Sequence, residues 1–322
     1  MIRIGVIGTG RLGTRHAQHF AGLERCTVTA VADPNEEAAQ AIAQELGAQA
    51  FTDCNEMFDE IDAAVIASPN FLHAEQAIAC ANAGKHVWIE KPMALTTVDA
   101  DRIVAAVEAH GVQSFVGFSV RFEGVIRTMQ RLFDEGQVGD LVSIWSRRMS
   151  YSRHRNPESW RHSHAASGGF MSELLAHEID WVMAIAGLPT SVYCRIATRV
   201  ADDPRANEHV WMTLAFGPGA TGMLEGSAMS FVPDYYRGVS GTEGGIYTQD
   251  WGRALVLSKG RDDSTALELD PSLDKYAHFL DVIEERCPSQ ADAAWGRAVV
   301  MVGEKALDSA VSGAVVPLLN IE

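Results

Sequence analysis

Residues 2–13 read Ile-Arg-Ile-Gly-Val-Ile-Gly-Thr-Gly-Arg-Leu-Gly, a mostly apolar strand that leads into the pattern Gly8-x-Gly10-x-x-Gly13. A strand of this kind is typical of a parallel sheet that is buried on both faces. Gly8 permits a tight turn, Gly10 lets the backbone approach a pyrophosphate, and Gly13 lets the next helix pack closely on the strand. Phosphate charge then meets the free N–H groups at the helix start. The pattern predicts a dinucleotide site, to which Arg11 and Leu12 also belong; Arg11 either helps to hold phosphate or is simply exposed.

An acidic residue follows the glycine turn at the spacing that such a site requires. Asp33 lies twenty residues after Gly13, at the end of the second expected strand, residues 27–32. A carboxylate in this place accepts hydrogen bonds from both ribose hydroxyls and repels a 2′-phosphate. We therefore expect NAD as the cofactor, with NADP as the alternative. The competing interpretation is a glycine-rich turn followed by a solvated Asp33.

Strands and helices alternate over the first part of the chain. Strands are expected at residues 2–7, 27–32, 63–67, 86–89 and 115–118, and helices at 12–23, 34–47, 72–83 and 98–109. Such alternation with short connections is typical of a doubly wound parallel sheet. Residues 1–120 are therefore predicted to form an α/β nucleotide-binding domain of the Rossmann type.

The remaining residues, 121–322, have a different rhythm. Apolar and polar residues alternate over 141–149, 191–198, 209–216, 221–229, 245–249 and 254–258, and helices are expected at 273–285 and 291–312. This pattern predicts an α+β domain with a largely antiparallel open sheet and helices on one face. A chain of 322 residues suits two domains.

Composition and charge narrow the class of protein. The formal net charge of −16 argues against nucleic acid or acidic membranes as partners. No run of 18 apolar residues is present, and the N-terminus has no basic-then-apolar leader pattern. The five cysteines are scattered, which is typical of reduced thiols in a cytoplasmic protein and gives no metal signature.

The segment Gly84-Lys85-His86-Val87-Trp88-Ile89-Glu90-Lys91-Pro92 brings a lysine to the carboxyl end of a buried strand, where ligands bind in such sheets. Pro92 cannot continue a central strand and biases Lys91 toward an extended conformation. Lys91 is therefore a candidate active-site lysine. The plain alternative is a lysine that is paired with Glu90.

A second polar segment, Ser68-Pro69-Asn70-Phe71-Leu72-His73, leaves the expected strand at 63–67. Ser68 and Asn70 are placed to hold the nicotinamide ribose, although the same residues also suit a turn and a helix cap. His73 is interpreted as a histidine on a helix face rather than a catalyst.

A third cluster lies where a glycine turn, Ser167-Gly168-Gly169, leads into an expected helix. Glu173, His177 and Asp180 are spaced four and three residues apart, which places them on one face of an α-helix. A carboxylate, an imidazole and a lysine in one pocket can relay a proton to or from a hydroxyl. The alternatives are a metal site, which we do not favour, and a helix surface with a Glu–His pair.

Together these segments resemble the glucose–fructose oxidoreductase, inositol 2-dehydrogenase and rhizopine catabolism (Gfo/Idh/MocA) family. The resemblance rests on the glycine loop, on Ser68-Pro69-Asn70-x-x-His73, on Glu90-Lys91-Pro92, on Arg121-Phe122, and on the stretch from Gly168-Gly169 to His177 and Asp180. It implies that Lys91 and His177 act on a substrate hydroxyl while hydride passes to or from nicotinamide. It also implies nucleotide contacts from residues beyond the glycine loop and Asp33, namely Ser68, Asn70, His73, Glu90, Lys91, Arg121, Trp160 and Arg161.

Three departures from the family pattern bear on the substrate. Glu173 stands where aspartate is common, Leu175 where glycine is common, and Ser167 replaces the first glycine of a frequent triplet. Glu173 would position His177 or bind a neighbouring hydroxyl. These changes predict a substrate other than simple inositols.

Residues 147–164 form a basic segment, with five arginines and three histidines against one acid. One hypothesis is that Arg153 and Arg155 bind an anionic substrate such as a sugar acid; the alternative is ion pairing or a solvated loop. Tyr236 and His278 are further candidate pocket residues.

The predicted activity is an NAD(P)-dependent oxidoreductase acting on CH–OH groups of a sugar, polyol or sugar acid. One alternative is a redox-neutral NAD-dependent glycosidase, since some relatives use transient oxidation in this way. The other is a non-catalytic sensor that binds NAD or sugar. The resemblance further implies a homodimer or homotetramer formed through the open sheet face.

Overall fold

The computed structural model describes residues 1–151, 159–197, 209–217 and 219–321. These residues form two compact units. Unit 1 comprises residues 1–117 and 274–300, and unit 2 comprises residues 118–273 and 301–322.

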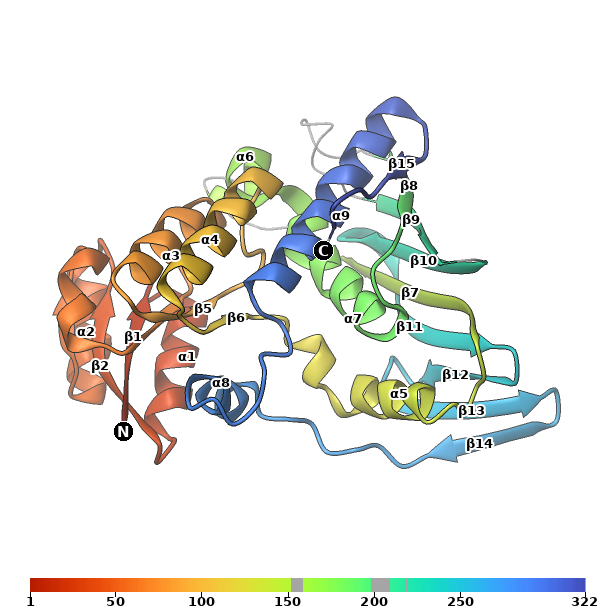
Figure 1. Ribbon diagram of the computed structural model, residues 1–322, viewed down its shortest axis with the longest axis horizontal. Helices are drawn as coiled ribbons and strands as arrows, with labels where there is room; N and C mark the ends of the chain where they lie inside the picture. The colour runs from red at the N-terminus through yellow and green to blue at the C-terminus, as the bar shows by residue number, and fades with distance from the viewer. Residues whose placement is uncertain (152–158, 198–208, 218, 322) are drawn as a thin grey trace. The chain divides into compact units, whose positions relative to one another are not determined.

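The sheet of unit 1 has six strands in the order β3-β2-β1-β4-β5-β6, and every neighbouring pair is parallel. Figure 1 labels β1, β2, β5 and β6 of this sheet. Its strands are β1 (Ile2–Ile7), β2 (Cys26–Ala32), β3 (Gln49–Phe51), β4 (Ala63–Ile66), β5 (His86–Ile89) and β6 (Ser114–Val116). The predicted Rossmann-type sheet is confirmed. Strand β3 was not expected, because it has only three residues and the first two are exposed.

Capping residues help to set the ends of the helices of unit 1. Asn35 caps α2 (Glu36–Leu46) by accepting a hydrogen bond from the Ala38 amide, and Gly47 ends it in a left-handed conformation. The other helices are α1 (Arg11–Ala21), α3 (His73–Asn82), α4 (Thr97–His110), α8 (Lys275–Ile283) and the first residues of α9 (Ala293–Ser312).

An aromatic cluster ties α8 to the sheet of unit 1. Trp88 of β5 is fully buried and packs against Tyr276 and Phe279 of α8, with ring centroids 5.1 and 5.6 Å away. Phe20 of α1 meets the same three rings. The segment that begins at residue 274 therefore completes the core of a unit whose sheet comes from the first 117 residues.

Unit 2 contains a nine-stranded sheet in the order β14-β13-β12-β11-β7-β10-β9-β8-β15. Its strands are β7 (Leu141–Tyr151), β8 (Ser191–Ala197), β9 (His209–Phe216), β10 (Ala220–Ser227), β11 (Met229–Gly241), β12 (Gly244–Gln249), β13 (Ala254–Gly260), β14 (Asp263–Leu267) and β15 (Val316–Pro317). Neighbours are antiparallel except for β7 and β10, which run parallel. The prediction of a largely antiparallel sheet is confirmed.

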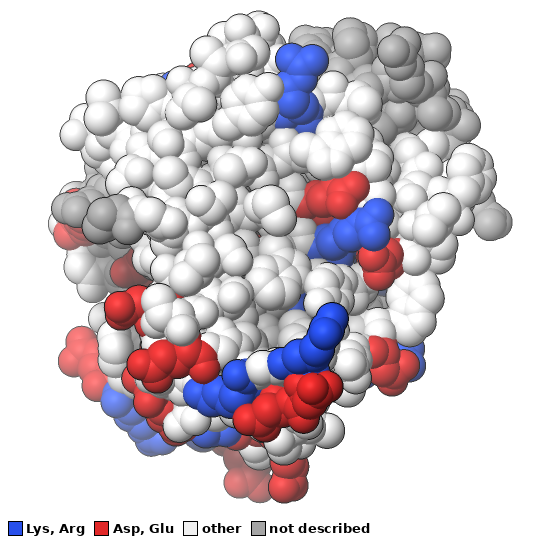
Figure 2. Space-filling view, turned by 90° about the vertical axis from the view of Figure 1, so that its right-hand side faces the viewer, with Lys and Arg blue, Asp and Glu red and all other residues white. Residues whose placement is uncertain are grey.

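Helices cover one face of this sheet. Helix α5 (Gly124–Asp134) contacts β13, and α7 (Ala176–Ala186) contacts β7 and β10. Large apolar side chains remain exposed elsewhere on the strands, among them Val142, Trp211 and Met223, and Figure 2 shows a broad face with few charged residues at its centre. Among the described helices, none combines the length and the apolar character needed to cross a membrane.

The longest strand, β11, was missed by the sequence analysis because it contains Pro233. The pairing of β11 with β7 is interrupted between Met229 and Asp234, so Pro233 lies where no ladder hydrogen bond is required of it. Helix α5 was also missed, although it has an apolar face with buried Val125, Ile126 and Met129.

Candidate active site

The glycine turn of unit 1 shows which of its glycines the fold itself requires. Gly8 has a φ of 91°, and a Cβ added there would lie 2.8 Å from the Ser68 amide nitrogen. A Cβ on Gly13 would lie 1.8 Å from the Gly8 carbonyl oxygen. A Cβ on Gly10, by contrast, would meet no atom of the chain within 4 Å. Gly10 therefore leaves open space at the start of α1, which fits the close approach of a pyrophosphate.

Asp33 is held next to this turn by hydrogen bonds. Its Oδ2 accepts from the Thr9 amide at 2.8 Å and from the Thr9 hydroxyl at 3.0 Å, and its Oδ1 accepts from the Asn35 amide at 2.9 Å. The carboxylate is thus fixed at the end of β2 rather than loosely solvated. Thr9 was missed by the sequence analysis, since it is the variable residue of the glycine pattern. Arg11 and Leu12 are exposed on the first turn of α1.

His73 connects the two loops that follow β4 and β5. Its ring is buried, with Nδ1 lying 2.8 Å from the Pro92 carbonyl oxygen and Nε2 lying 3.0 Å from that of Ser68. A neutral imidazole can donate to only one of these carbonyls. Burial lowers the pKa of His73 and favours the neutral ring, although both carbonyls act in the opposite direction. The structure thus places His73 inside unit 1, where its ring contacts one backbone carbonyl in each of the two loops.

Ser68, Asn70 and Lys91, in the two loops that His73 connects, were predicted to contact the cofactor. Ser68 donates its hydroxyl to Gln76 Oε1 at 2.6 Å, and Asn70 is buried. Lys91 is the second residue after β5 and is half-buried. These residues all lie at the carboxyl edge of the parallel sheet.

Glu90 was also predicted to contact the cofactor, and the structure places its side chain among interior residues of unit 1. Its side chain is buried, and Oε1 lies 3.0 Å from His16 Nε2 and 3.1 Å from the Trp88 indole nitrogen that donates to it. The carboxylate therefore faces the interior of unit 1. His16 could have been noticed in the sequence, because it falls on the buried stripe of α1 with Gly13, Ala17 and Phe20.

In unit 2, the prediction of a regular α-helix over Glu173, His177 and Asp180 is wrong for the turn that contains Glu173. Residues Met171–Leu175 form a π-helical turn, and α7 begins at Ala176. In a π-turn the backbone bonds span five residues, so a spacing of four no longer stacks two side chains as in an α-helix.

The three polar side chains accordingly have different surroundings. Glu173 Oε2 accepts from Arg161 Nε at 3.1 Å, and the Arg161 guanidinium lies over the Trp160 ring at 4.4 Å. Asp180 is fully buried and binds the Arg121 guanidinium through both carboxylate oxygens. His177 is half-buried near Phe118, with ring centroids 6.4 Å apart. Arg121, predicted at the cofactor, thus anchors α7 through Asp180.

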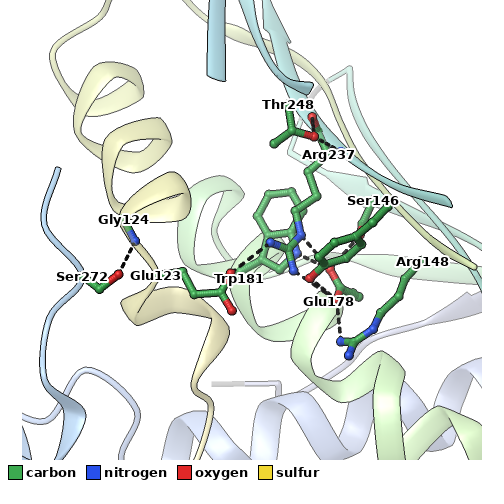
Figure 3. A network of polar contacts seen from close by, with 10 residues as sticks. Glu123, Gly124, Ser146, Arg148, Glu178, Trp181, Arg237, Thr248 and Ser272 are labelled. Atoms are coloured by element: carbon green, nitrogen blue, oxygen red, sulfur yellow. Dashed lines mark hydrogen bonds and ion pairs between the residues drawn. The ribbon is translucent and has the colours of Figure 1, made fainter. Parts of the chain in front are cut away.

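A buried ionic cluster next to His177 was not predicted (Figure 3). Glu178 is fully buried, and its Oε2 accepts from the Ser146 hydroxyl at 2.7 Å and from the Trp181 indole nitrogen at 2.6 Å. Its Oε1 accepts from Arg148 Nη1 at 3.0 Å. Arg237, also fully buried, places Nε 3.3 Å from Glu178 Oε2.

These contacts keep Glu178 charged. Burial alone would raise the pKa of Glu178, but the charges of Arg237 and Arg148, with the hydrogen bonds from Ser146 and Trp181, outweigh it and lower that pKa to about 2. The cluster joins α7 to β7 and β11 at the residue after His177. It therefore fixes the first turn of the helix that carries this histidine.

The described arginines of the basic segment are ion-paired within unit 2. Arg147 pairs with Glu225 at 2.9 Å and with Asp234 at 2.8 Å, whereas Arg148 and Arg161 pair with Glu178 and Glu173 as above. Arg153 and Arg155 lie outside the described residues. These contacts favour the ion-pairing interpretation for the described part of the segment.

Two further candidates lie away from these clusters. Tyr236 pairs in register with Arg147 of β7, while Glu178 of α7 contacts the flanking Ser146 and Arg148. Because side chains alternate along a strand, Tyr236 lies on the sheet face opposite α7 and does not join His177. His278 belongs to unit 1, where it is buried and its Nε2 accepts from the Gln290 amide.

Comparison with known proteins gives two family matches. Residues 2–118 match the oxidoreductase family with NAD-binding Rossmann fold, GFO/IDH/MocA, and residues 126–247 match the GFO/IDH/MocA C-terminal domain. The chain belongs to the Gfo/Idh/MocA oxidoreductase family. This is a family of NAD(P)-dependent dehydrogenases, and its nucleotide-binding match covers the glycine turn, Asp33 and Lys91.

Individual Gfo/Idh/MocA members extend the comparison. The chain is 30% identical over 253 residues to 2,7-anhydro-N-acetylneuraminate hydratase of Escherichia coli (strain K12), which covers 76% of this chain and 67% of that protein. It is 25% identical over 332 residues to myo-inositol 2-dehydrogenase of Thermotoga maritima, which covers 96% of each. A solved structure of levoglucosan dehydrogenase in complex with NADH and levoglucosan has a TM-score of 0.89 at 22% identity, covering 99% of this chain and 100% of that one. The last likeness is one of fold.

Proposed function

We propose that this Gfo/Idh/MocA member is an NAD-dependent oxidoreductase that transfers a hydride between a CH–OH carbon of a sugar, polyol or sugar acid and nicotinamide. The observation that carries the proposal is the difference in free space around Gly8, Gly10 and Gly13. The fold requires Gly8 and Gly13 to lack side chains, whereas the bare Gly10 leaves space that suits a bound pyrophosphate. Asp33, fixed beside this turn, supports NAD over NADP.

The proposed chemistry assigns a proton role to two residues, as the family resemblance implies. Bound nicotinamide supplies the acceptor or donor of the hydride. During oxidation the substrate carbon gives up its hydride, and neutral Lys91 accepts the hydroxyl proton as the C=O bond forms. His177 orients that hydroxyl or shares the proton transfer. Reduction reverses each step, with the Lys91 ammonium as the proton donor.

Support for the role of Lys91 comes from its position. It follows β5 at the carboxyl edge of the parallel sheet, where ligands bind in doubly wound folds. Support for a polyhydroxy substrate comes from the names of relatives, which include an inositol dehydrogenase and a levoglucosan dehydrogenase. Glu173 is the less direct candidate, because its carboxylate already accepts a hydrogen bond from Arg161.

The proposal is tested by the absorbance of NADH. The purified chain is mixed with NAD or NADP and a panel of inositols, aldoses, anhydro-sugars, uronic acids and aldonic acids. We expect NADH to accumulate over many turnovers with one sugar class and faster with NAD than with NADP. An absence of net NADH with every compound, although NAD binds, would contradict a net dehydrogenase.

A redox-neutral reaction is the second candidate function. The observation that favours it is the 30% identity to a 2,7-anhydro-N-acetylneuraminate hydratase. The same panel distinguishes this function from the first, because mass spectrometry would then find a converted sugar without a matching rise in NADH. A glycosidase of this kind regenerates NAD in each cycle.

Asp33→Asn is expected to raise the Kd for NAD about tenfold, because a charged hydrogen-bond acceptor is lost. The ratio of the Kd for NADP to the Kd for NAD should fall by about the same factor, because the 2′-phosphate of NADP is no longer repelled. The measurement is tryptophan fluorescence quenching by each nucleotide. Asp53→Asn is the matched control, since Asp53 Oδ1 also accepts from the amide two residues on, at 2.9 Å. Equal effects of both variants would mean that Asp33 only stabilises its turn.

A further inference from the structure

A line of buried polar side chains in unit 1 ends at the residue before Lys91. Tyr276 of α8 places its hydroxyl 3.0 Å from His16 Nδ1, and His16 Nε2 lies 3.0 Å from Glu90 Oε1. Trp88 donates its indole N–H to the same carboxylate oxygen. His16 is fully buried, and Glu90 and Tyr276 are nearly so. The proposed reaction leaves the Tyr276–His16–Glu90 line without a role.

The Glu90 carboxylate is fixed in place as well as hydrogen-bonded. A Cβ added to Gly117 would lie 2.4 Å from Glu90 Oε1, so the glycine is needed to make room for this carboxylate. On the other side, Lys275 places its Nζ 5.1 Å from the centre of the Trp88 ring and 5.3 Å from that of Tyr276. Side chains from α1, β5 and α8 therefore surround one carboxylate.

These neighbours keep Glu90 ionised. Burial raises the pKa of Glu90, but the hydrogen bond with His16 and the positive charge of Lys275 and Lys91 outweigh burial and hold that pKa well below its usual range. The pKa of Lys275 is in turn lowered by burial, which Glu90 partly offsets. Two further titratable groups among the described residues interact electrostatically with Glu90: the Tyr276 phenol of α8 and His73 of α3, whose ring lies between backbone carbonyls.

We propose that His16, Tyr276 and Lys275 are positioning residues that hold the carboxylate of Glu90, the residue before Lys91, fixed in the interior of unit 1, and that this negative charge sets the pH range in which Lys91 accepts the substrate proton. The inference rests on the proposed proton role of Lys91. A fixed negative charge favours the ammonium form of a neighbouring lysine. It thereby makes Lys91 a better proton acceptor and keeps it charged to a higher pH than it would otherwise be.

The test titrates Lys91 without relying on turnover. Trace acetylation with acetic anhydride is followed by mass spectrometry from pH 6 to 11, and the pH at which Lys91 is half-reactive is read for each variant. Glu90→Gln keeps the shape of the side chain and removes its charge. We expect the midpoint to fall by about one pH unit, because an opposite charge no longer favours the ammonium form.

His16 is tested by a pair of variants with a control on the same helix. His16→Leu removes the imidazole whose Nε2 lies 3.0 Å from Glu90 Oε1 and should produce part of the same downward shift, whereas His16→Gln, which keeps a polar group at this position, should restore most of the original midpoint. His19→Gln is the control, because exposed His19 stacks on Tyr276 without contacting Glu90. Its midpoint should match that of the unaltered chain.

The outcomes separate this inference from the proposed function. An unchanged Lys91 midpoint in Glu90→Gln, or in His16→Leu, overturns the inference whether or not the chain is active. Kd for NAD and the Tm of each variant show that it is folded. If the midpoints move as expected but Lys91→Ala keeps full activity, the effect of the Glu90 charge on Lys91 is confirmed. The proton transfer by Lys91 is then refuted, and with it the proposed role of the Glu90 charge in catalysis.

Discussion

Lys91→Ala is expected to lower kcat about 10²- to 10⁴-fold, the usual contribution of a positioned general base or acid. The hydroxyl proton must leave as the hydride leaves, and without the amine it would have to pass to water or to a less suitable group. The Kd for NAD should change less than kcat, because Lys91 is only one of the expected nucleotide contacts, and the glycine turn and Asp33 remain. Steady-state NADH formation and fluorescence titration measure the two effects.

The matched control lies at the other end of the same strand. Lys85 precedes β5 by one residue and therefore lies at the amino edge of the sheet, away from the edge where ligands bind. Lys85→Ala should keep kcat near that of the unaltered chain. A Lys91→Ala variant that loses no more activity than Lys85→Ala would remove Lys91 from the mechanism.

A second substitution separates proton transfer from charge alone. Lys91→Arg keeps a positive charge, but a guanidinium does not release its proton in the range in which proteins function. If Lys91 acts as a proton acceptor, this variant should be nearly as slow as Lys91→Ala at every pH. Activity close to that of the unaltered chain would instead mean that Lys91 only stabilises negative charge.

The parallel sheet could be predicted from the sequence because its signals are local. A strand buried on both faces must be apolar throughout, and residues 2–7 and 86–89 are observed as strands with the expected bounds. The glycine spacing likewise encodes steric demands that arise within a few residues. Strand β11 could not be predicted in this way, because Pro233 is acceptable only where its pairing with β7 is interrupted.

The partners of buried charges could not be predicted, because they are distant in sequence. His16 and Tyr276 are separated by 260 residues, and Glu178 and Arg237 by 59. A sequence indicates that a histidine on an apolar helix stripe, or an acid inside an apolar run, needs a partner. It does not indicate which residue the fold supplies, and the contact between Glu90 and His16 was therefore not predicted.

The second large effect is expected from the ionic cluster around Glu178. Glu178→Ala should reduce the free energy of unfolding by about 3–5 kcal/mol, the usual cost of breaking a buried ion pair by removing one partner. Arg237 would lose the carboxylate that its buried guanidinium contacts, and the Ser146 hydroxyl and Trp181 indole would lose their acceptor. Urea unfolding followed by circular dichroism measures the change.

A partly exposed carboxylate on the opposite sheet face provides the control. Glu225 pairs with Arg147 at 2.9 Å, but both side chains are partly exposed and Arg147 also pairs with Asp234. Glu225→Ala should therefore cost about 0–1 kcal/mol. Equal losses for the two variants would mean that burial of the Glu178 cluster adds nothing to the strength of its ion pairs.

The stabilisation by Glu178 is also expected to depend on pH in a definite direction. The pKa of Glu178 is lowered to about 2 in the folded chain, so its contribution is fully present above the ordinary glutamate pKa and is lost as pH falls from about 4.5 toward 2. Burial raises the pKa of neighbouring Glu123, which acts with the opposite sign and over the range above the ordinary glutamate pKa. Comparison with Glu178→Gln removes the ionisation of Glu178 and keeps the Glu123 carboxyl, whose pKa is raised mainly by burial and to a lesser degree by the Glu178 charge. The unaltered chain should lose stability more steeply below pH 4.5 than Glu178→Gln does, and parallel pH curves would show that the Glu178 charge does not stabilise the fold.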